Sequence, residues 1–312
     1  MKRLLLILIA AASCISYAAA QITDYSVFDD KWNVLLVNDS GRNGYYDQKP
    51  LAEMMGQMAE DGIDPEFVVA IGDVHHFYGV ASVNDPLWMT NYELIYAHPE
   101  LMIIWYACLG NHEYRGNTQA CIDYSEVSRR WEMPDRYYTK AFAGGDGMTI
   151  RIVWVDTSPL INKYRENTEL YPDACKQDDE AQLEWLDKVL AEATEDWVIV
   201  VGHHPIFADT TKDLYERTDM QQRLDPVLRR HHVDMYINGH IHNFQHVRVA
   251  GSDIDYITNS AAALSRNVNP IEGTQFCDPS TGFSVLSATK STLELRMINN
   301  AGSVIHTVTR TK

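Results

Sequence analysis

The sequence predicts an α/β protein in which strands alternate with helices. Short apolar runs alternate with segments whose apolar residues recur at helical spacing, which is typical of α/β architecture. From about Asp253 onward the chain reads as strand after strand with no clear helix, which a single parallel sheet does not explain. A mixed sheet, or two packed sheets with helices outside in a four-layer, α+β-like arrangement, accounts for both patterns.

The individual elements follow from these runs. Strands are expected at 34–37, 67–71, 102–107, 149–155, 197–201, 233–237, 254–258, 283–287, 292–298 and 304–309. Helices are expected at 50–61, 87–97, 120–131, 179–193 and 220–231. In the fourth helix Leu183, Leu186, Val189 and Leu190 form one apolar face. No repeat or low-complexity linker divides the chain, so a single domain is expected over 21–312.

The first twenty residues have the pattern of a secretory signal peptide. Lys2 and Arg3 precede the apolar run "LLLILIAAA" and small residues at 18–20, which predicts cleavage before Gln21. The run is too short for a membrane anchor, so we expect a periplasmic or secreted protein with no transmembrane segment in its mature chain. Lipid anchoring at Cys14 is a minor alternative, because alanine stands three residues earlier where leucine is usual.

The composition is that of an acidic globular protein. Hydrophobic residues make up 46% of the 312 residues and charged residues 22%, with a formal net charge of −17. So acidic a chain is not expected to bind nucleic acid through a general electrostatic footprint. An anionic substrate would instead need a local positive centre, such as metal ions. We expect a monomer.

The cysteines do not predict a thiolate metal site. Cys108, Cys121, Cys175 and Cys277 remain after cleavage, and three pairings are open to them if they oxidise. Cys108 lies in the apolar stretch "LMIIWYACL" and is expected in the core. No CxxC pair is present, which argues against a zinc–thiolate site.

Five apolar runs each end in a turn that presents Asp, Asn or His. The turns are "NDSG" with Asp39, "GDVHH" with Asp73, His75 and His76, "GNHE" with Asn111 and His112, "GHHP" with His203 and His204, and "NGHIHN" with His240 and His242. One such turn alone is explained by turn chemistry. Five together indicate one crevice, because sites in open α/β sheets form beyond the carboxyl ends of strands. Carboxylate, carboxamide and imidazole suit Zn²⁺, Fe or Mn²⁺, and so many ligands allow two metals to share one carboxylate.

This ordered set of motifs resembles the calcineurin-like metallophosphoesterase superfamily, and within it the small mammalian-type purple (tartrate-resistant) acid phosphatases. The stretches "YSEVSRRWEMPDRYY", "AQLEWLDKVLAEATEDWVIVVGHHP" and "DPVLRRHHVDMYINGHIHNFQHV" are similar to that group as well. The resemblance runs from about Trp32 to the C-terminus. It implies the metallophosphoesterase fold, a β-sandwich of two mixed sheets flanked by helices. It also implies a hydrolase of the acid phosphatase type that acts on small phosphorylated substrates and has a binuclear metal centre.

The resemblance also implies roles for individual residues. The first metal would take Asp39, Asp73, His76 and His242, and the second would take Asp73, Asn111, His203 and His240, with Asp73 bridging. The catalytic group would be His112, Asp73 and Asn111. A metal-bound hydroxide would attack a phosphate monoester while His112, as general acid, protonates the leaving oxygen. The ions are expected to be divalent Fe, Mn or Zn, with Fe/Zn and Fe/Fe pairs as alternatives. His204 and Asn243 adjoin ligands and are expected to support the site.

Two departures from the family pattern affect the site. The family has tyrosine three residues after the bridging aspartate, where this chain has His76. Gly41 stands where the Asp-x-His motif of many metallophosphoesterases supplies a histidine, so His76 is expected to restore an imidazole, whereas His75 is one residue early. Without a phenolate ligand, divalent ions are favoured over ferric iron and the protein should be colourless or weakly coloured.

The second departure is in the loop "IFADTTKDLYERTD", which lacks a histidine common in the family. Lys212 offers positive charge there, although surface lysines usually contribute little. The pH optimum and the substrate are therefore left open. A phosphodiesterase or nucleotide hydrolase is one alternative, which the rate on a diester against the matching monoester would distinguish. A non-catalytic metal- or phosphate-binding protein is another, against which His112 argues, because a binder needs no proton donor.

Overall fold

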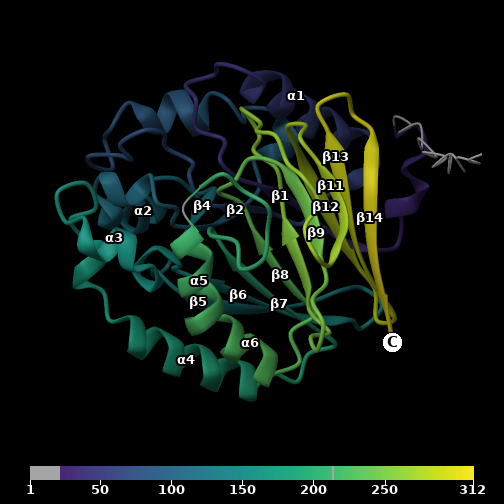
Figure 1. Ribbon diagram of the computed structural model, residues 1–312. Coiled ribbons are helices and arrows are strands. Elements are labelled where there is room, and N and C mark those ends of the chain that lie inside the picture. The colour runs from purple at the N-terminus through teal and green to yellow at the C-terminus, as the bar shows by residue number, and fades with distance from the viewer. Residues whose placement is uncertain (1–21, 213) are drawn as a thin grey trace, which may run out of the picture.

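The computed structural model describes residues 22–212 and 214–312, and it contains two seven-stranded sheets with helices on the outside (Figure 1). The predicted signal peptide and Cys14 lie outside the described residues. The predicted fold class is confirmed. The ring of Tyr106 on the first sheet lies 5.4 Å from that of Trp154 on the second, so large buried aromatics join the two sheets.

The first sheet has the order β14-β13-β12-β1-β2-β3-β4. Its strands are β1 (Trp32–Val37), β2 (Val68–Ile71), β3 (Trp105–Cys108), β4 (Trp131–Glu132), β12 (Gly282–Ala288), β13 (Thr292–Asn299) and β14 (Val304–Thr311). The strands β1 to β4 are parallel, and β12 joins them antiparallel, followed by β13 and β14. The carboxyl ends of β1, β2 and β3 therefore meet at one edge of this sheet.

The second sheet has the order β11-β9-β10-β8-β7-β6-β5. Its strands are β5 (Tyr138–Ala143), β6 (Thr149–Val155), β7 (Trp197–Gly202), β8 (Met235–Asn238), β9 (Phe244–Val247), β10 (Asp255–Thr258) and β11 (Thr274–Asp278). The strands β6, β7, β8 and β10 are parallel, and the others are antiparallel to their neighbours. The parallel strands β7 and β8 thus also place their carboxyl ends together.

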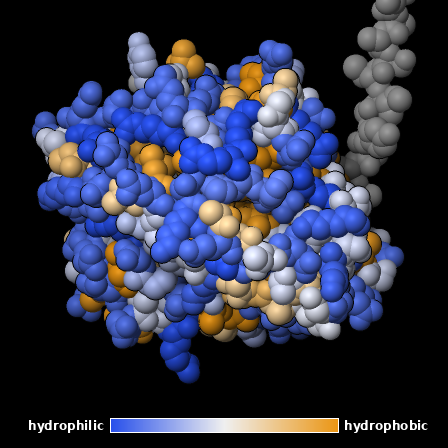
Figure 2. All heavy atoms as spheres, turned by 90° about the horizontal axis from the view of Figure 1, so that it is seen from below, coloured by the Kyte–Doolittle hydropathy of each residue, from blue (hydrophilic) through white to orange (hydrophobic). Residues whose placement is uncertain are grey.

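Six α-helices are described: α1 (Gln48–Met58), α2 (Thr118–Asp123), α3 (Asn162–Glu166), α4 (Asp179–Ala191), α5 (Leu214–Arg223) and α6 (Asp225–Arg230). In Figure 1, α1 lies at the top of the molecule, and α4 and α6 run below the second sheet. Asp178 caps α4 by accepting a hydrogen bond from the backbone N–H of Ala181, and Leu186 and Leu190 on its apolar face are buried. Seen from below, the face over these helices is mostly hydrophilic (Figure 2). None of the described helices is long and apolar enough to cross a membrane.

Most predicted strands are confirmed, but three predicted helices differ from the structure. The segment predicted at 87–97 forms a short helical stretch that includes the π turn Met89–Glu93. Gln48 Nε2 donates a hydrogen bond to the carbonyl of Asn91, and the N–H of Ile95 donates to the carbonyl of Tyr92. These bonds replace those that a longer α-helix would make. The helix predicted at 120–131 ends at Asp123, since Trp131 pairs with β3 as strand β4.

The helix predicted at 220–231 is divided into α5 and α6. Pro226 lies in the first turn of α6 and has no N–H with which to continue α5. Strands β4, β5, β9 and β11 were not predicted, because their sequences are too short or too polar to read as apolar runs. Cys108 is buried as expected, and the four cysteines of the described residues are unpaired.

Candidate metal centre

The turns after β1, β2, β3, β7 and β8 bring the predicted ligands together. Ligand atoms of Asp39, Asp73 and His203 lie within 4.8 Å of one another. The same limit holds for Asp39, His76 and His242, and for Asp73, His76 and His112. Residues from both sheets thus meet in one buried cluster.

The backbone of these turns is held in an uncommon conformation. Asp39 has φ 48°, Asp73 52°, His240 72° and His242 60°. Such values are rare for residues other than glycine and persist only where the surroundings fix them. Gly239 allows the turns to touch, because a Cβ there would lie 2.6 Å from Asp39 Oδ2. The surrounding contacts therefore hold each turn in the conformation that directs its side chain into the cluster.

Glu113 joins two of the turns. Its carboxylate accepts hydrogen bonds from the N–H groups of Asp73 and His75, each at 2.9 Å, and of Gly110 at 2.8 Å. Burial, reinforced by the charge of Asp73, raises the pKa of Glu113 to about 7. Glu113 is the last residue of the turn "GNHE", but the local pattern alone does not assign it a role.

Three histidines are each oriented by a hydrogen bond at one ring nitrogen. His203 Nδ1 lies 2.9 Å from the carbonyl of Ile71, and His242 Nδ1 lies 2.6 Å from that of Leu264. His240 Nε2 lies 2.9 Å from Glu216 Oε2. This pattern is typical of metal-ligating histidines, since it leaves the other nitrogen free as a ligand.

The second ring nitrogens of His203 and His242 face the carboxylates of the cluster, whereas His240 Nδ1 lies 3.1 Å from Lys212 Nζ and 3.3 Å from His203 Nε2. His203 Nε2 lies 3.1 Å from Asp73 Oδ2, and His242 Nε2 lies 3.1 Å from Asp39 Oδ1. Burial alone would lower the pKa of His203, but the charges of Asp73 and Asp39 raise it to about 9. A metal cation could occupy the place that a proton otherwise takes between these groups.

Several buried ligand atoms of the cluster have no hydrogen-bond partner. Within residues 22–212 and 214–312, these atoms are Asn111 Oδ1 and both ring nitrogens of His76, while Asp39 Oδ1 and Asp73 Oδ2 are contacted by histidine nitrogens. All four residues are buried, and buried polar atoms without partners are costly. Oxygen and imidazole donors in this arrangement fit divalent metal ions.

His76 and His75 have different surroundings. His76 Nε2 lies 3.5 Å from Asp73 Oδ2, and its ring belongs to the cluster with Asp39 and His242. His75 packs edge-on against Trp88 with ring centroids 4.4 Å apart, and burial lowers its pKa to about 3. This arrangement agrees with the preference for His76, because His75 fills the core.

His112 lies at the edge of the cluster. Its Nδ1 is 2.8 Å from the carbonyl of Phe77, and its Nε2 is 3.9 Å from Asp73 Oδ2. Its backbone N–H donates to Asp73 Oδ1 at 2.8 Å. Partial burial lowers the pKa of His112, and the charge of Asp73 opposes this effect. The side chain can thus face a molecule that enters the crevice.

His204 and Asn243 hold the frame of the site. His204 Nδ1 lies 2.7 Å from Thr157 Oγ1 and His204 Nε2 lies 3.0 Å from the hydroxyl of Tyr164, so neither nitrogen is free for a metal. The Asn243 side chain bonds to Gln245 and to the carbonyl of Asn267.

Glu216 and Lys212 come from the loop that lacks the family's histidine. Glu216 Oε1 accepts hydrogen bonds from Lys163 at 2.6 Å and Tyr164 at 2.9 Å, while its Oε2 contacts His240. Lys212 Nζ lies 2.7 Å from the carbonyl of His240, and burial lowers its pKa to about 8. Lys212 is therefore partly buried against His240 and is not a free surface lysine. Neither placement is visible in a local pattern.

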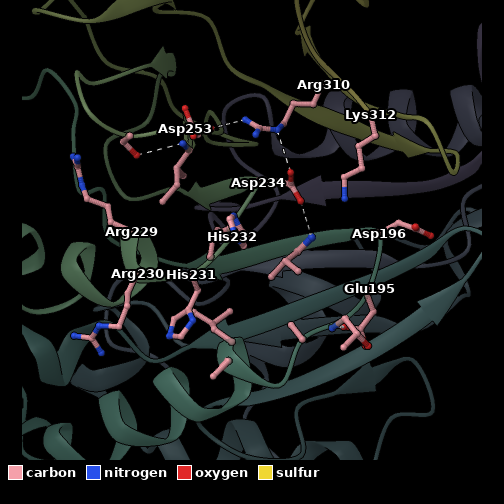
Figure 3. A pocket seen from close by; sticks show the side chains of 18 of the residues that line it. Glu195, Asp196, Arg229, Arg230, His231, His232, Asp234, Asp253, Arg310 and Lys312 are labelled. Carbon is pink, nitrogen blue, oxygen red and sulfur yellow. Dashed lines mark hydrogen bonds and ion pairs between the residues drawn. The ribbon is translucent and has the colours of Figure 1, made fainter.

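The described residues also form a large cavity away from this cluster. A cavity of about 670 Å³ lies between the end of α4, the end of α6 and β14. Figure 3 shows Arg310 between Asp253 and Asp234, with 3.2 Å from its Nε to Asp234 Oδ1. The cavity's other charged groups are largely paired too, such as Arg229 with Asp225 and Glu195 with Arg151. This arrangement offers no set of ligand atoms.

Comparisons with known proteins agree with the fold and the cluster. The calcineurin-like phosphoesterase family profile matches residues 33–244. Purple acid phosphatase 3 of Arabidopsis thaliana is 30% identical over 89% of this chain and 77% of its own length. Human tartrate-resistant acid phosphatase type 5 is 31% identical over 59% of this chain and 57% of its own length.

Two solved structures share the fold at lower identity. The structure titled GAP50, the anchor in the inner membrane complex of Plasmodium, has a TM-score of 0.77 at 21% identity, covering 90% of this chain and 89% of its own. Purple acid phosphatase PPD1 of yellow lupin has a TM-score of 0.62 at 17% identity, covering 90% and 54%. On the family profile and the Arabidopsis relative, the chain belongs to the calcineurin-like phosphoesterase family, with purple acid phosphatases among its homologues.

Proposed function

We propose that this protein hydrolyses phosphate monoesters at a centre of two metal ions. The observation that carries the proposal is the convergence of buried carboxylate and imidazole ligand atoms at the meeting point of five turns, where Asn111 Oδ1 and both ring nitrogens of His76 have no hydrogen-bond partner among the described residues. Orphaned atoms of this kind are expected where an ion completes the structure.

The two ions would share Asp73. The first would be held by Asp39, Asp73, His76 and His242, and the second by Asp73, Asn111, His203 and His240. Bound there, two divalent ions of Fe, Mn or Zn would neutralise phosphate charge and supply an activated water as the nucleophile. The ring nitrogens donate hydrogen bonds to the carbonyls of Ile71 and Leu264 and to the carboxylate of Glu216, and these bonds support the assignment because they fix the orientation of each ring.

The surrounding cations would attract the substrate phosphate. Arg266 is close enough to both Arg42 and Lys212 to act on their charges, although the whole chain carries −17. An anion therefore meets a local positive field in an otherwise acidic molecule.

His112 would donate the proton to the leaving oxygen. Its Nδ1 is fixed by the carbonyl of Phe77, which turns Nε2 toward the crevice. General acid catalysis of this kind accelerates reactions by about 10²–10⁴. The role needs a protonated imidazole, so the rate should fall as the pH rises above the pKa of His112.

The test is hydrolysis of a phosphoester panel by protein that carries a measured number of metal ions. We expect monoesters to be hydrolysed faster than the matching diesters. Faster cleavage of the diesters would assign the phosphodiesterase alternative, and no hydrolysis with two ions bound per chain would assign a non-catalytic binder. Export as a single-domain monomer is part of the proposal, and mass spectrometry of the mature N-terminus would check cleavage before Gln21.

A further inference from the structure

A second pocket adjoins the proposed metal centre. It has a volume of about 390 Å³, and its lining includes Arg42, Tyr45, Tyr46, His76 and Phe77. His76 belongs both to this pocket and to the ligand cluster. A molecule whose phosphate lies on the metals would therefore place its leaving group beside or inside this pocket.

The walls of the pocket are exposed aromatic rings. The exposed fractions are 71% for Tyr45, 64% for Tyr46 and 59% for Phe77. Aromatic residues of this size usually bury their faces, so three exposed rings around one hollow indicate a surface for binding a flat apolar group.

The loop that carries the two tyrosines is tied down. The N–H groups of Arg42 and Gly44 donate to Gln48 Oε1 at 3.1 and 2.7 Å, and the N–H of Asn43 donates to Asn91 Oδ1 at 2.6 Å. The N–H of Asp47 donates to the carbonyl of Ala263 at 3.0 Å. The rings are thus presented by a fixed backbone, which reduces the entropy lost on binding.

Arg42 supplies an unpaired cation at the base of the pocket. It is 7% exposed, and its Nε and Nη1 have no hydrogen-bond partner in the part of the chain that is described. Its guanidinium lies 4.9 Å from the ring centroid of Phe77. A buried guanidinium with free N–H groups is suited to phosphate oxygens, to which it can donate two parallel hydrogen bonds.

We infer that the preferred substrates are phosphate monoesters whose leaving group carries an aromatic ring. The phosphate would lie between the metals and Arg42, and the ring would stack in the pocket against Tyr45, Tyr46 and Phe77. The volume suits a single ring system. This inference rests on the proposed function, because it names the substrate class of the same site.

The test is calorimetric binding of two inert phosphonates to protein with two metals bound. Benzylphosphonate has a flat ring, and cyclohexylmethylphosphonate has the same carbon skeleton without the flat face. We expect benzylphosphonate to bind about three- to tenfold more tightly, the range of an aromatic pair. Equal affinities, or no binding of either compound, would overturn the inference.

The matched variants are Tyr45→Ala and Tyr78→Ala. Both tyrosines are 71% exposed, but Tyr78 does not line the pocket. Only Tyr45→Ala should reduce the preference for benzylphosphonate, and an equal loss in Tyr78→Ala would count against the pocket. Arg42→Gln should weaken both phosphonates alike, since it removes a phosphate contact and leaves the aromatic walls.

Steady-state kinetics distinguish an aryl ester from a nucleotide as the substrate. A lower KM for phosphotyrosine than for adenosine monophosphate assigns an aryl ester, and the reverse assigns a nucleotide, whereas a lower KM for glycerol phosphate than for both contradicts the inference. Selective binding of benzylphosphonate without hydrolysis of any ester would refute the proposed function and leave the aromatic pocket standing.

Discussion

The proposed metal centre and the cavity of Figure 3 are both rich in charged side chains, yet they differ in how these are paired. In the cavity, Arg310 bonds to Asp234 and Asp255, and Glu195 bonds to Arg151. In the metal centre, carboxylate and imidazole ligand atoms converge without a Lys or Arg ion pair to Asp39 or Asp73 among the described residues. The cavity is larger than the pocket beside the metal centre, at about 670 against 390 Å³. The comparison teaches that converging ligand atoms, rather than volume, distinguish the proposed metal centre.

The largest difference between the regions should come from two Asp→Asn substitutions. Asp73→Asn should lose both bound metal and activity, with a rate reduced more than about 100-fold, because this carboxylate is proposed to bridge two ions. Asp234→Asn in the cavity should retain two ions per chain and the activity of the unmodified protein. Metal analysis of both variants checks the prediction. Two ions retained in Asp73→Asn would show that the bridge is misplaced.

His112→Ala sharpens the comparison within the metal centre. It should slow hydrolysis of alkyl phosphates by about 10²–10⁴ and of aryl phosphates much less, because an aryl leaving group needs less protonation. Steady-state rates on one alkyl and one aryl ester measure the ratio. Equal losses on both would remove His112 from the role of general acid.

A smaller effect is expected for Glu216→Gln. This carboxylate contacts His240 Nε2 at 2.9 Å and should orient the ring, so its loss should weaken metal binding by about 10–100-fold. Glu195→Gln is the matched control, since Glu195 lines the cavity and bonds to Arg151. Calorimetric titration with Zn²⁺ compares the two. Equal metal affinities would mean that Glu216 has no orienting role.

The smallest effect on activity is expected for Arg310→Ala. Burial alone would raise the pKa of Asp255, but hydrogen bonds from His246, Arg248 and Arg310 lower it. The stability from this lowered pKa is present above the ordinary value of 3.8 and is lost as the pH falls further. Arg310→Ala should therefore reduce the free energy of unfolding by about 1–3 kcal/mol near pH 7 and by less in acid. Urea unfolding measures this change, and a large loss of bound metal would contradict the separation of the two regions.

The sequence was sufficient to predict the ligand turns, because each residue of this set follows an apolar run at a fixed place. The meeting of the turns that carry Asp39, Asp73, Asn111, His203 and His240 needed only the rule that strand ends converge, whereas the choice of ligands within each turn came from the family resemblance. His76 required the comparison with a family tyrosine. The fold class followed from the alternation of strand and helix patterns.

The supporting residues could not be predicted in the same way, because their roles depend on distant contacts. Arg42 reads as a loop arginine, and only the folded chain buries it beside Phe77. Glu216 is 24 residues from His240 in sequence. The helix predicted at 120–131 was wrong in its C-terminal part for a related reason. Trp131 pairs with β3 as part of a strand, a distant contact that its local sequence does not indicate.

The visible spectrum of iron-loaded His76→Tyr tests the central claim most directly. If residue 76 is a ligand of the first metal, a tyrosinate there should give a purple or pink charge-transfer band, while the unmodified protein should be colourless or weakly coloured. The band does not depend on activity, so it reports on ligation alone. The absence of a band with two irons bound, or an intense band in the unmodified protein that disappears in Tyr78→Phe, would contradict the account.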